Sequence, residues 1–571
     1  MATGRRAWTL AAVPAGGARR ASVVDFGADP TGRNDATAAV QKAIASLARR
    51  NARLVFPAGK YTFAASNSIL MGFRGYEGLE IFGNGAELSF AGATRPLQLT
   101  ECRDLEIHDI IVDWTRPPFS QGVIRATTDH SVTVAVDSAY PVDGSEPIHA
   151  LLSFDSNAKT PVATGVNVYS VGAAQLRGRQ TLEIPLGVQR RFESVDRVVL
   201  LHPHSDAAAL RLEGCEQILL ETVVFHAAPG AAVIFSGCRD ITLDTLRVIP
   251  HPGSGRLISS CGGGVEILDS TGTISAQHAL IDGTAGAGMR VQQSYWRLSQ
   301  VKDPQVALFA STDGKPVPEW LLPQQGTFMQ ISAAGSLKLL GEIAVTKAEA
   351  VPGGMQLTFD ETLSPAVGKG ALFCLSATNQ AQLKMDDCRF VGGPYAGLVA
   401  QSRIRVGNSR FSGYAGPAIL LAPDLVHMRG PVVENIHIAD SSFTQCNQAP
   451  WEKWGGAITI DTQFGRRHMA TPELRINEGI TVQRNSFHDL DGPGIYCAGA
   501  TWLDVESNHF HNCDTLRPAG AEPRAIVLRN LDQSTITTNE ATGAAKIVLI
   551  DCTDTVKVGD NGPLINMNAT S

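Results

Sequence analysis

Apolar residues recur along the middle of the chain in short, spaced runs. Residues 208–215 (AALRLEGC) are echoed by residues 231–238 (AAVIFSGC), and in each copy another apolar run follows, beginning at Ile218 or Ile241. A repeat of about 20 to 25 residues with two short apolar strands cannot bury its inner face alone, so successive repeats must stack on one another. The pattern therefore predicts the coils of a parallel β-helix, on which function lies along an outer face.

A different pattern opens the chain. Within residues 36–49 apolar side chains recur at helical spacing, and Asn34 or Asp35 can cap this helix. We expect the helix to cover the first coil, because a covered edge cannot pair with another chain. This opening, with its Asp-Phe-Gly-Ala segment at 25–28 and a Phe-Pro-x-Gly-x-Tyr segment at 56–61, resembles the cap of pectin-degrading, right-handed β-helix proteins.

The coil pattern is interrupted twice. Residues 131–136 (SVTVAV) alternate as antiparallel strands do, and a second β-rich stretch follows later, so we expect two inserted β-barrels. The predicted fold is all-β, a right-handed parallel β-helix with an N-terminal capping helix and two antiparallel β-barrel insertions. The expected organisation is a disordered or processed N-terminus (1–21), cap and first coils (22–119), first barrel (120–200), coils (201–294), second barrel (295–378) and C-terminal coils (379–571).

Two series of residues are expected to stack inside the coils. Phenylalanines recur two residues after Ser or Asn, which predicts a ladder of rings beside a polar corner: Phe411, Phe443, Phe487 and Phe510. Cys215, Cys238 and Cys261 recur at a constant step, and the chain has no Cys-x-x-Cys pair. We therefore predict free thiols stacked in the core, with a disulfide as the alternative.

The composition limits the fold and the classes of binding partner that the protein can have. The 56 Gly and 30 Pro with only 18% charged residues fit short strands and tight corners. A net charge of −7 without a basic stripe argues against nucleic acid, and the absence of an 18-residue apolar run argues against a membrane span. Residues 1–20, with two Arg pairs around an interrupted apolar stretch, faintly indicate an export leader and hence a periplasmic or extracellular protein.

Three segments resemble glycoside hydrolase family 110, the α-1,3-galactosidases: residues 114–122 (WTRPPFSQG), 226–230 (HAAPG) and 254–256 (SGR). The likeness extends from about residue 20 to 550. It implies a β-helix with two inserted barrels and a carbohydrate substrate, either an oligosaccharide or a polysaccharide containing galactose or a related sugar, with no cofactor.

The sequence departs from that family where its acids are expected. Alignment with the family places Gly263 at an Asp, Gly286 and Ala287 at an Asp pair, Arg290 at an Asn and Gln292 at a His. Residues 426–430 (VHMRG) stand where the family has Trp-x-Glu-Ser-Gly. Inverting hydrolysis needs one acid and one carboxylate base, which glycine and alanine cannot supply. We therefore expect a glycoside hydrolase with a rebuilt active site.

Replacement acids are predicted at four positions. Glu266 lies on a strand whose neighbours point inward, so its carboxylate points outward, with an ordinary surface residue as the alternative. Asp282 lies in the same two coils, as does the further candidate Asp269, and ordinary turn chemistry is the alternative for both. Glu452 and Asp461 belong to the cluster at 451–468, in which they are the expected acid and base.

Substrate contacts are predicted from the same segments. Trp451 and Trp454 flank Glu452 and offer stacking surfaces for a sugar, with a hydrophobic plug as the alternative. The remaining expected contacts are Arg256, Arg290, His226 and Arg467. No metal site is expected, although His202, His204 and Asp206 have the spacing of ligands on one strand face.

Two further function classes stay open. The protein could bind glycans without turnover, using the same outer face. It could also be a lyase or epimerase on uronates, in which Arg290 or Lys453 is the base and a bound Ca²⁺ neutralises the substrate carboxylate.

Overall fold

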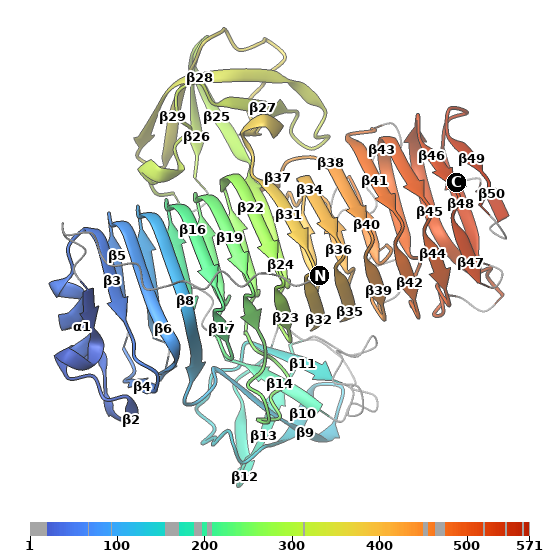
Figure 1. The fold of residues 1–571 in the computed structure, drawn as a ribbon. Coiled ribbons are helices and arrows are strands. Elements are labelled where there is room, and N and C mark those ends of the chain that lie inside the picture. The colour runs from blue at the N-terminus through green and yellow to red at the C-terminus, as the bar shows by residue number, and fades with distance from the viewer. Residues whose placement is uncertain are drawn as a thin grey trace, which may run out of the picture.

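The computed structural model describes most of the chain. These residues form a long parallel β-helix that carries one β-rich insertion on each of two opposite sides (Figure 1). The described residues are 20–66, 68–92, 94–154, 171–187, 197–202, 208–311, 314–448, 455–462, 474–517, 520–542, 545–561 and 565–569.

Each coil contributes strands to three parallel sheets. The first sheet, on which the candidate site lies, contains β5 (Ile69–Arg74), β7 (Arg95–Thr100), β15 (Leu210–Glu213), β18 (Val233–Ser236), β21 (Val265–Leu268), β24 (Met289–Ser294), β33 (Leu398–Ala400), β36 (Ile419–Leu421), β40 (Ile458–Ile460), β43 (Ile495–Glu506), β45 (Arg524–Asp532), β48 (Lys546–Ile550) and β50 (Ile565–Ala569). The second contains β1 (Arg20–Ser22), β3 (Arg50–Val55), β6 (Glu77–Phe90), β8 (Arg103–Trp114), β16 (Glu216–Glu221), β19 (Arg239–Asp244), β22 (Thr271–Gln277), β31 (Gln382–Asp386), β34 (Ser402–Gly407), β38 (Glu434–Ala439), β41 (Asn477–Gln483), β46 (Thr535–Thr537) and β49 (Lys557–Gly559). The third contains β2 (Thr31–Asp35), β4 (Lys60–Phe63), β17 (Val224–Phe225), β20 (Arg247–Val248), β23 (Leu280–Asp282), β32 (Arg389–Gly393), β35 (Arg410–Tyr414), β39 (Ser442–Thr444), β42 (Ser486–His488), β44 (His509–His511) and β47 (Glu540–Thr542).

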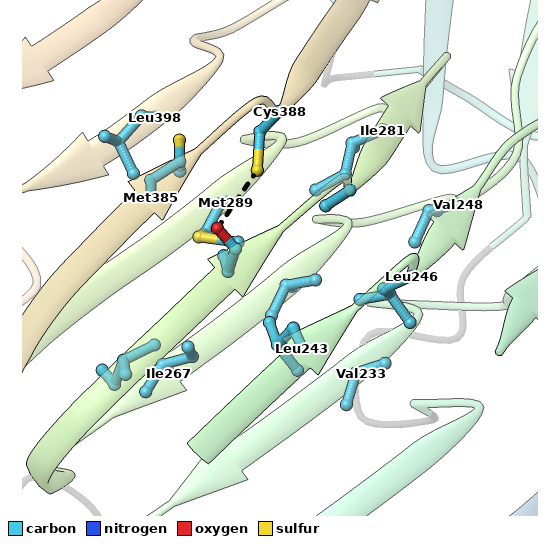
Figure 2. Close-up of a cluster of buried hydrophobic side chains, with 14 of the residues drawn as sticks. Val233, Leu243, Leu246, Val248, Ile267, Ile281, Met289, Met385, Cys388 and Leu398 are labelled. Atoms are coloured by element: carbon cyan, nitrogen blue, oxygen red, sulfur yellow. Dashed lines mark hydrogen bonds between the residues drawn. The ribbon is translucent and has the colours of Figure 1, made fainter. Parts of the chain in front are cut away.

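The core lies inside this triangular stack. Alternate residues of every strand point inward, so Val233, Leu243 and Val248 of one coil meet Ile267 and Met289 of the next coils (Figure 2). Each coil buries its apolar row against its neighbours, which is why the sequence repeat must propagate.

The capping helix α1 (Thr37–Ser46) covers the first coil, as the sequence predicts. Asp35 Oδ1 accepts hydrogen bonds from the Thr37 backbone N–H at 3.0 Å and from its hydroxyl at 2.6 Å. The carboxylate therefore satisfies a free amide of the first turn, although Ala36 is the N-cap residue. A short 3-10 helix, η1 (Val23–Phe26), precedes it.

The stacked phenylalanines are confirmed. Rings at Phe390, Phe411, Phe443, Phe487 and Phe510 lie nearly parallel in succession, with centroids 4.7–5.3 Å apart. Beside them runs an asparagine ladder, in which the side-chain amide of each residue donates to the carboxamide oxygen of the next, from Asn485 through Asn508 and Asn539 to Asn561.

Replacing Asn508 with Ala should lower the free energy of unfolding by about 1–3 kcal/mol, because the side chain is fully buried and bonds both neighbouring coils. Chemical denaturation measures this loss. Ser507→Ala, at the adjacent corner, is the matched control and should change stability by less than about 0.5 kcal/mol. Equal losses in the two variants would contradict the role of the ladder.

The free thiols stacked in the core are confirmed, but one of the three predicted cysteines does not belong to the stack. All ten cysteines are free. The Cys102 backbone N–H meets Cys215 Sγ at 3.4 Å, and the next coils continue with Cys238 and then Ser270. Cys261 is wrong as a member, because it lies at the corner before β21, where its thiol donates to the Pro118 carbonyl. The extra loop in that coil shifts the register of the repeat.

The first insertion is an antiparallel sheet in the order β11 (Ala150–Phe154), β14 (Arg197–Leu201), β9 (Phe119–Thr127), β10 (Ser131–Val136), β13 (Thr181–Pro185), β12 (Gln175–Gly178). The second is a closed barrel of β25 (Trp296–Asp303), β26 (Val306–Ala310), β29 (Gly354–Phe359), β28 (Leu339–Val351), β27 (Phe328–Ser332) and β30 (Leu372–Leu375), with the 3-10 turns η2 (Glu319–Leu321) and η3 (Ala377–Asn379). Within the described ranges closure is therefore seen only for the second insertion, since the fully exposed β12 ends the first sheet.

A buried carboxyl lies where the second barrel meets the stack. Glu434 is only 8% exposed, and its Oε1 has no hydrogen-bond partner among the described residues. Burial, followed by repulsion from Glu478 and Glu342, raises the pKa of Glu434 to about 7, although Arg403 opposes the shift. The junction thus favours the protonated acid.

Stability should therefore depend on pH through Glu434. The unfolded carboxyl has a pKa of about 4.3, so its contribution is fully present below that pH and is lost as the pH rises toward 7. The slope should reach about 1.4 kcal/mol per pH unit in this window. Urea unfolding at several pH values should show that Glu434→Gln removes this slope, whereas Glu361→Gln, an exposed control, keeps it. A slope that persists in Glu434→Gln would refute the assignment.

Candidate functional site

The two insertions leave the stack at opposite ends of first-sheet strands. The first insertion connects β8 to β15, at the amino ends of the first-sheet strands, and the second connects β24 to β31, at their carboxyl ends (Figure 1). The outward side of β21 and β24 therefore lies between the two insertion points. Loops and inserted units at strand ends are where β-sheet scaffolds place their functional groups.

Glu266 occupies the centre of this surface. It faces outward from β21, between inward-facing Val265 and Ile267, as the sequence predicts. A Cβ atom built on Gly263 would lie 2.9 Å from Glu266 Oε1 and 3.2 Å from the Glu266 Cγ. The Glu266 carboxylate thus occupies the space that a side chain at position 263 would need.

The following coil also lacks room for side chains. A Cβ atom on Gly286 would lie 2.9 Å from the Gly263 nitrogen and 3.0 Å from the Gly262 carbonyl carbon. Backbone atoms cannot yield as a flexible side chain can, so an Asp at 286 would require the chain to move. Ala287 is buried beside Val399 in a small apolar cluster. This corner is built for glycine and alanine.

Arg290 follows Glu266 in register on the neighbouring strand β24. Its Nη1 donates to Gln292 Oε1 at 2.8 Å, and its guanidinium carbon lies 5.8 Å from the centre of the Tyr395 ring. Gln292 Nε2 and, one coil later, Gln401 Oε1 have no hydrogen-bond partner among the described residues, and both side chains are almost fully buried. Beneath the surface at Arg290 there are therefore one donor and one acceptor without a partner among the described residues, both enclosed by the protein.

The polar surface is closed in one direction along the stack. Beyond Arg290 the outward row continues with Val399 and Leu420, each 2% exposed. In the other direction it continues from Glu266 through Ile234, which is 9% exposed, to Arg211, whose side chain is 27% exposed. Among the described residues of this row, the direction toward the N-terminal coils is therefore the more open one for an extended ligand on Glu266.

Arg256 and His226 lie together at the junction with the first insertion. Arg256 Nη1 forms a 2.6 Å ion pair with Asp113 Oδ1, and the two side chains are 10% and 6% exposed. The Asp113 carboxylate also accepts the Trp114 backbone N–H at 2.7 Å. Gln121, from the first insertion, holds both sides of this loop through the Gly255 carbonyl and the Leu257 amide. Arg256 is thus engaged in joining the insertion to the stack.

His226 is buried in the same junction. Its Nδ1 lies 3.1 Å from the Ile249 carbonyl, which can only accept, so Nδ1 carries the proton and Nε2 is the acceptor nitrogen of the ring. Burial lowers the pKa of His226, which favours this neutral ring. The His251 ring centroid lies 4.8 Å away.

Sequence comparison places this architecture among known proteins. Residues 21–98 match the family described as rhamnogalacturonase A/epimerase, pectate lyase-like, and residues 373–562 match the right handed beta helix region. Alpha-1,3-galactosidase B of Bacteroides thetaiotaomicron is 24% identical, over 93% of this chain and 92% of its own. Alpha-1,3-galactosidase A of Shewanella woodyi is 22% identical, over 82% of each chain. The chain is a relative of the α-1,3-galactosidases.

This relationship confirms the resemblance drawn from the three sequence motifs, and the helix-region match confirms the right-handed coil. Among solved structures, the family 28 exopolygalacturonase of Yersinia enterocolitica is 12% identical, with a TM-score of 0.45 over 96% of this chain and 78% of its own.

In the present structure, the 226–230 and 254–256 motifs lie at the junction around Asp113. Asp113 was missed because its partner lies far along the chain, although it directly precedes the 114–122 motif.

The other predicted acids lie elsewhere. Asp461 follows β40, four strands from Glu266 along the first sheet, or roughly 19 Å at the usual strand spacing. Its Oδ1 accepts the Thr462 backbone N–H at 2.7 Å. Asp282 ends β23 on the third sheet, and its carbonyl accepts the Ser259 hydroxyl. The Asp269 carboxylate accepts hydrogen bonds from the Ser294 hydroxyl and the Arg429 guanidinium at the base of the second barrel.

Several predicted residues lie outside the described residues: Trp451, Glu452, Lys453, Trp454, Arg467, His204 and Asp206. His202 is buried, and its ring nitrogens meet the Ser120 hydroxyl at 3.0 Å and the Pro147 carbonyl at 2.8 Å. Within the described ranges no three His, Cys, Asp or Glu residues are grouped as a metal site requires. Among the residues that the structure describes, no helix is long and apolar enough to cross a bilayer.

Proposed function

We propose that the protein is a glycoside hydrolase that acts on galactose-containing or related glycans through a rebuilt site on the outward face of β21 and β24. The observation that carries the proposal is the place of Glu266. Its carboxylate oxygen lies 2.9 Å from where the first side-chain atom of residue 263 would stand. Alignment puts a family Asp at that position, so Glu266 supplies a carboxylate from three residues downstream to the same region.

Hydrolysis of a glycosidic bond needs two carboxyl groups, which lie about 5–10 Å apart across the scissile bond. Asp461 is roughly 19 Å from Glu266 along the sheet and is too distant for that pairing. Glu452, which lies outside the described residues, is kept as the predicted second acid. We assign Glu266 the role of the carboxylate fixed on the rigid stack and Arg290 the role of binding sugar hydroxyls, with Gln292 Oε1 orienting the Arg290 guanidinium.

The closed direction of the surface defines where the sugar ends. Val399 and Leu420 block the row beyond Arg290, so a terminal sugar would lie over β21 and β24 with the rest of the glycan directed toward β18. Trp451 and Trp454 remain the predicted stacking surfaces. A periplasmic or extracellular location remains part of this proposal, because glycans of this class are met there.

Product analysis tests the proposal. The purified protein should release free galactose from the α-galactosides in a panel of defined oligosaccharides. Chromatography of the reducing sugars detects this product. An ultraviolet-absorbing unsaturated product from uronate polymers would instead establish lyase chemistry. Binding to the panel without any product would refute the hydrolase proposal in favour of a glycan-binding protein.

A further inference from the structure

A second concave surface lies at the N-terminal end of the same sheet. A cavity of about 480 Å³ opens between the capping helix α1 and strands β5 and β7. Its lining includes apolar Ile69 and Phe73 together with polar Arg49, Arg74 and Gln98. This volume and this mixture of an apolar surface with a few polar groups are typical of small-ligand sites.

The polar groups of this cavity are held in place by the surrounding coils. The Arg49 guanidinium lies 4.9 Å from the centre of the Tyr76 ring, and it also donates to the Arg74 carbonyl. Arg74 Nε donates to Glu101 Oε2 at 2.9 Å. Gln98 Nε2 donates to Glu213 Oε2 at 3.0 Å. Groups fixed in this way lose little conformational freedom when a ligand binds.

Strand register places this cavity in line with the proposed active site. Gly72 and Gln98 line it, and they begin an outward row that continues through Arg211 and Ile234 to Glu266. Four strand steps separate Gly72 from Glu266, which corresponds to roughly 19 Å. The cavity and the carboxylate therefore face the same side of the molecule.

The second barrel borders the path between them. A Cβ atom on Gly214 would lie 2.6 Å from the Trp320 Cβ, and one on Gly237 would lie 2.6 Å from the Trp320 ring. The η2 turn thus covers the corners that follow β15 and β18. Because the row is more exposed on this side than beyond Arg290, a glycan placed on Glu266 is directed along this border, over Ile234, toward the cavity.

We propose that the cavity beneath α1 is a distal glycan-binding subsite, which holds the far part of an oligosaccharide whose terminal sugar lies over Glu266. The inference rests on the proposed function for the identity of its ligand. Amide and guanidinium groups beside apolar side chains fit the hydroxyls and the apolar ring faces of sugar residues. The subsite would make the protein prefer longer chains.

Gly72 offers a clean way to block the cavity. A Cβ atom there would meet only the Ile69 Cγ2 atom, at 3.7 Å, an ordinary contact, and the Gly72 backbone does not need the left-handed conformation. Gly72→Trp should therefore fill the cavity without disturbing the coil. Gly178→Trp is the matched control, because Gly178 lies on exposed β12 and its nearest neighbour would be the Thr181 Cβ at 4.0 Å.

The experiment measures affinity and turnover separately on a galactan series from disaccharide to hexasaccharide. In the natural protein the affinity should rise by about tenfold or more along the series. Gly72→Trp should abolish this rise while leaving the disaccharide affinity and turnover unchanged, and Gly178→Trp should keep it. A rise that survives Gly72→Trp, or turnover of disaccharide with no dependence on length, would overturn the subsite.

Failure of the two proposals can be told apart. Length-dependent binding that Gly72→Trp abolishes, without any turnover, would support the subsite and refute the hydrolase. Turnover without length dependence would do the reverse. If no member of the series binds or reacts, both proposals are wrong.

Discussion

Glu266→Gln should lower kcat for glycoside hydrolysis by about 100-fold to 10,000-fold, with little change in substrate affinity. The amide keeps the size and most contacts of the side chain but cannot act as an acid or as a base. Glu266 is half-buried, faces outward and carries no ion pair that supports the fold among the described residues. Steady-state kinetics, together with an unchanged thermal unfolding profile, would establish the loss as chemical.

Asp461→Asn is the matched control for this prediction. Asp461 is also an outward-facing acid on the first sheet, but it lies roughly 19 Å away and accepts the amide of Thr462. This variant should retain kcat within about threefold, unless its local turn is lost. If Asp461→Asn inactivates the enzyme and Glu266→Gln does not, the site lies three to four coils farther along the stack.

Most of the scaffold could be predicted because each coil repeats the same local pattern. The Phe411 and Phe443 ladder follows directly from the constant polar-x-Phe step, since stacked coils place equivalent residues one strand apart. Cys261 shows where this reasoning fails. It has the right spacing, yet the loop that carries Arg256 adds residues to that coil, and Ser270 takes the place beneath Cys238.

The candidate site was only partly accessible to the same reasoning. The outward direction of Glu266 follows from the alternation of a strand, and the structure confirms it. Its approach to Gly263 could not be predicted, because it depends on how the corner folds back toward the strand. Gln401 was missed because a carboxamide oxygen without a partner among the described residues has no local sequence signal.

The contacts at Arg256 change the interpretation of the three motifs. Arg256 and His226 were expected to bind substrate, but their hydrogen-bond partners are the Asp113 carboxylate and the backbone carbonyls of His226 and Ile249, all in the coils. These contacts give the 226–230 and 254–256 motifs a structural role beside the first insertion. Substrate binding by Arg256 and His226 stays a prediction.

Asp113→Ala should lower the free energy of unfolding by about 3–5 kcal/mol, the largest stability effect we expect. The substitution leaves the Arg256 charge buried without its partner and frees the Trp114 amide. Because this pair holds the loop to which Gln121 of the first insertion bonds, the loss should appear in urea unfolding and as easier proteolysis between the insertion and the coils.

The matched control is the exposed pair of Asp440 and Arg484, which is bidentate with both distances 2.8 Å but has side chains 44% and 50% exposed. Water already solvates these charges, so Asp440→Ala should cost less than about 1 kcal/mol. Combining Asp113→Leu with Arg256→Met should recover most of the lost stability, because removing both buried charges also removes the uncompensated one. Equal losses in Asp113→Ala and Asp440→Ala would show that burial does not determine the strength of the Asp113 pair.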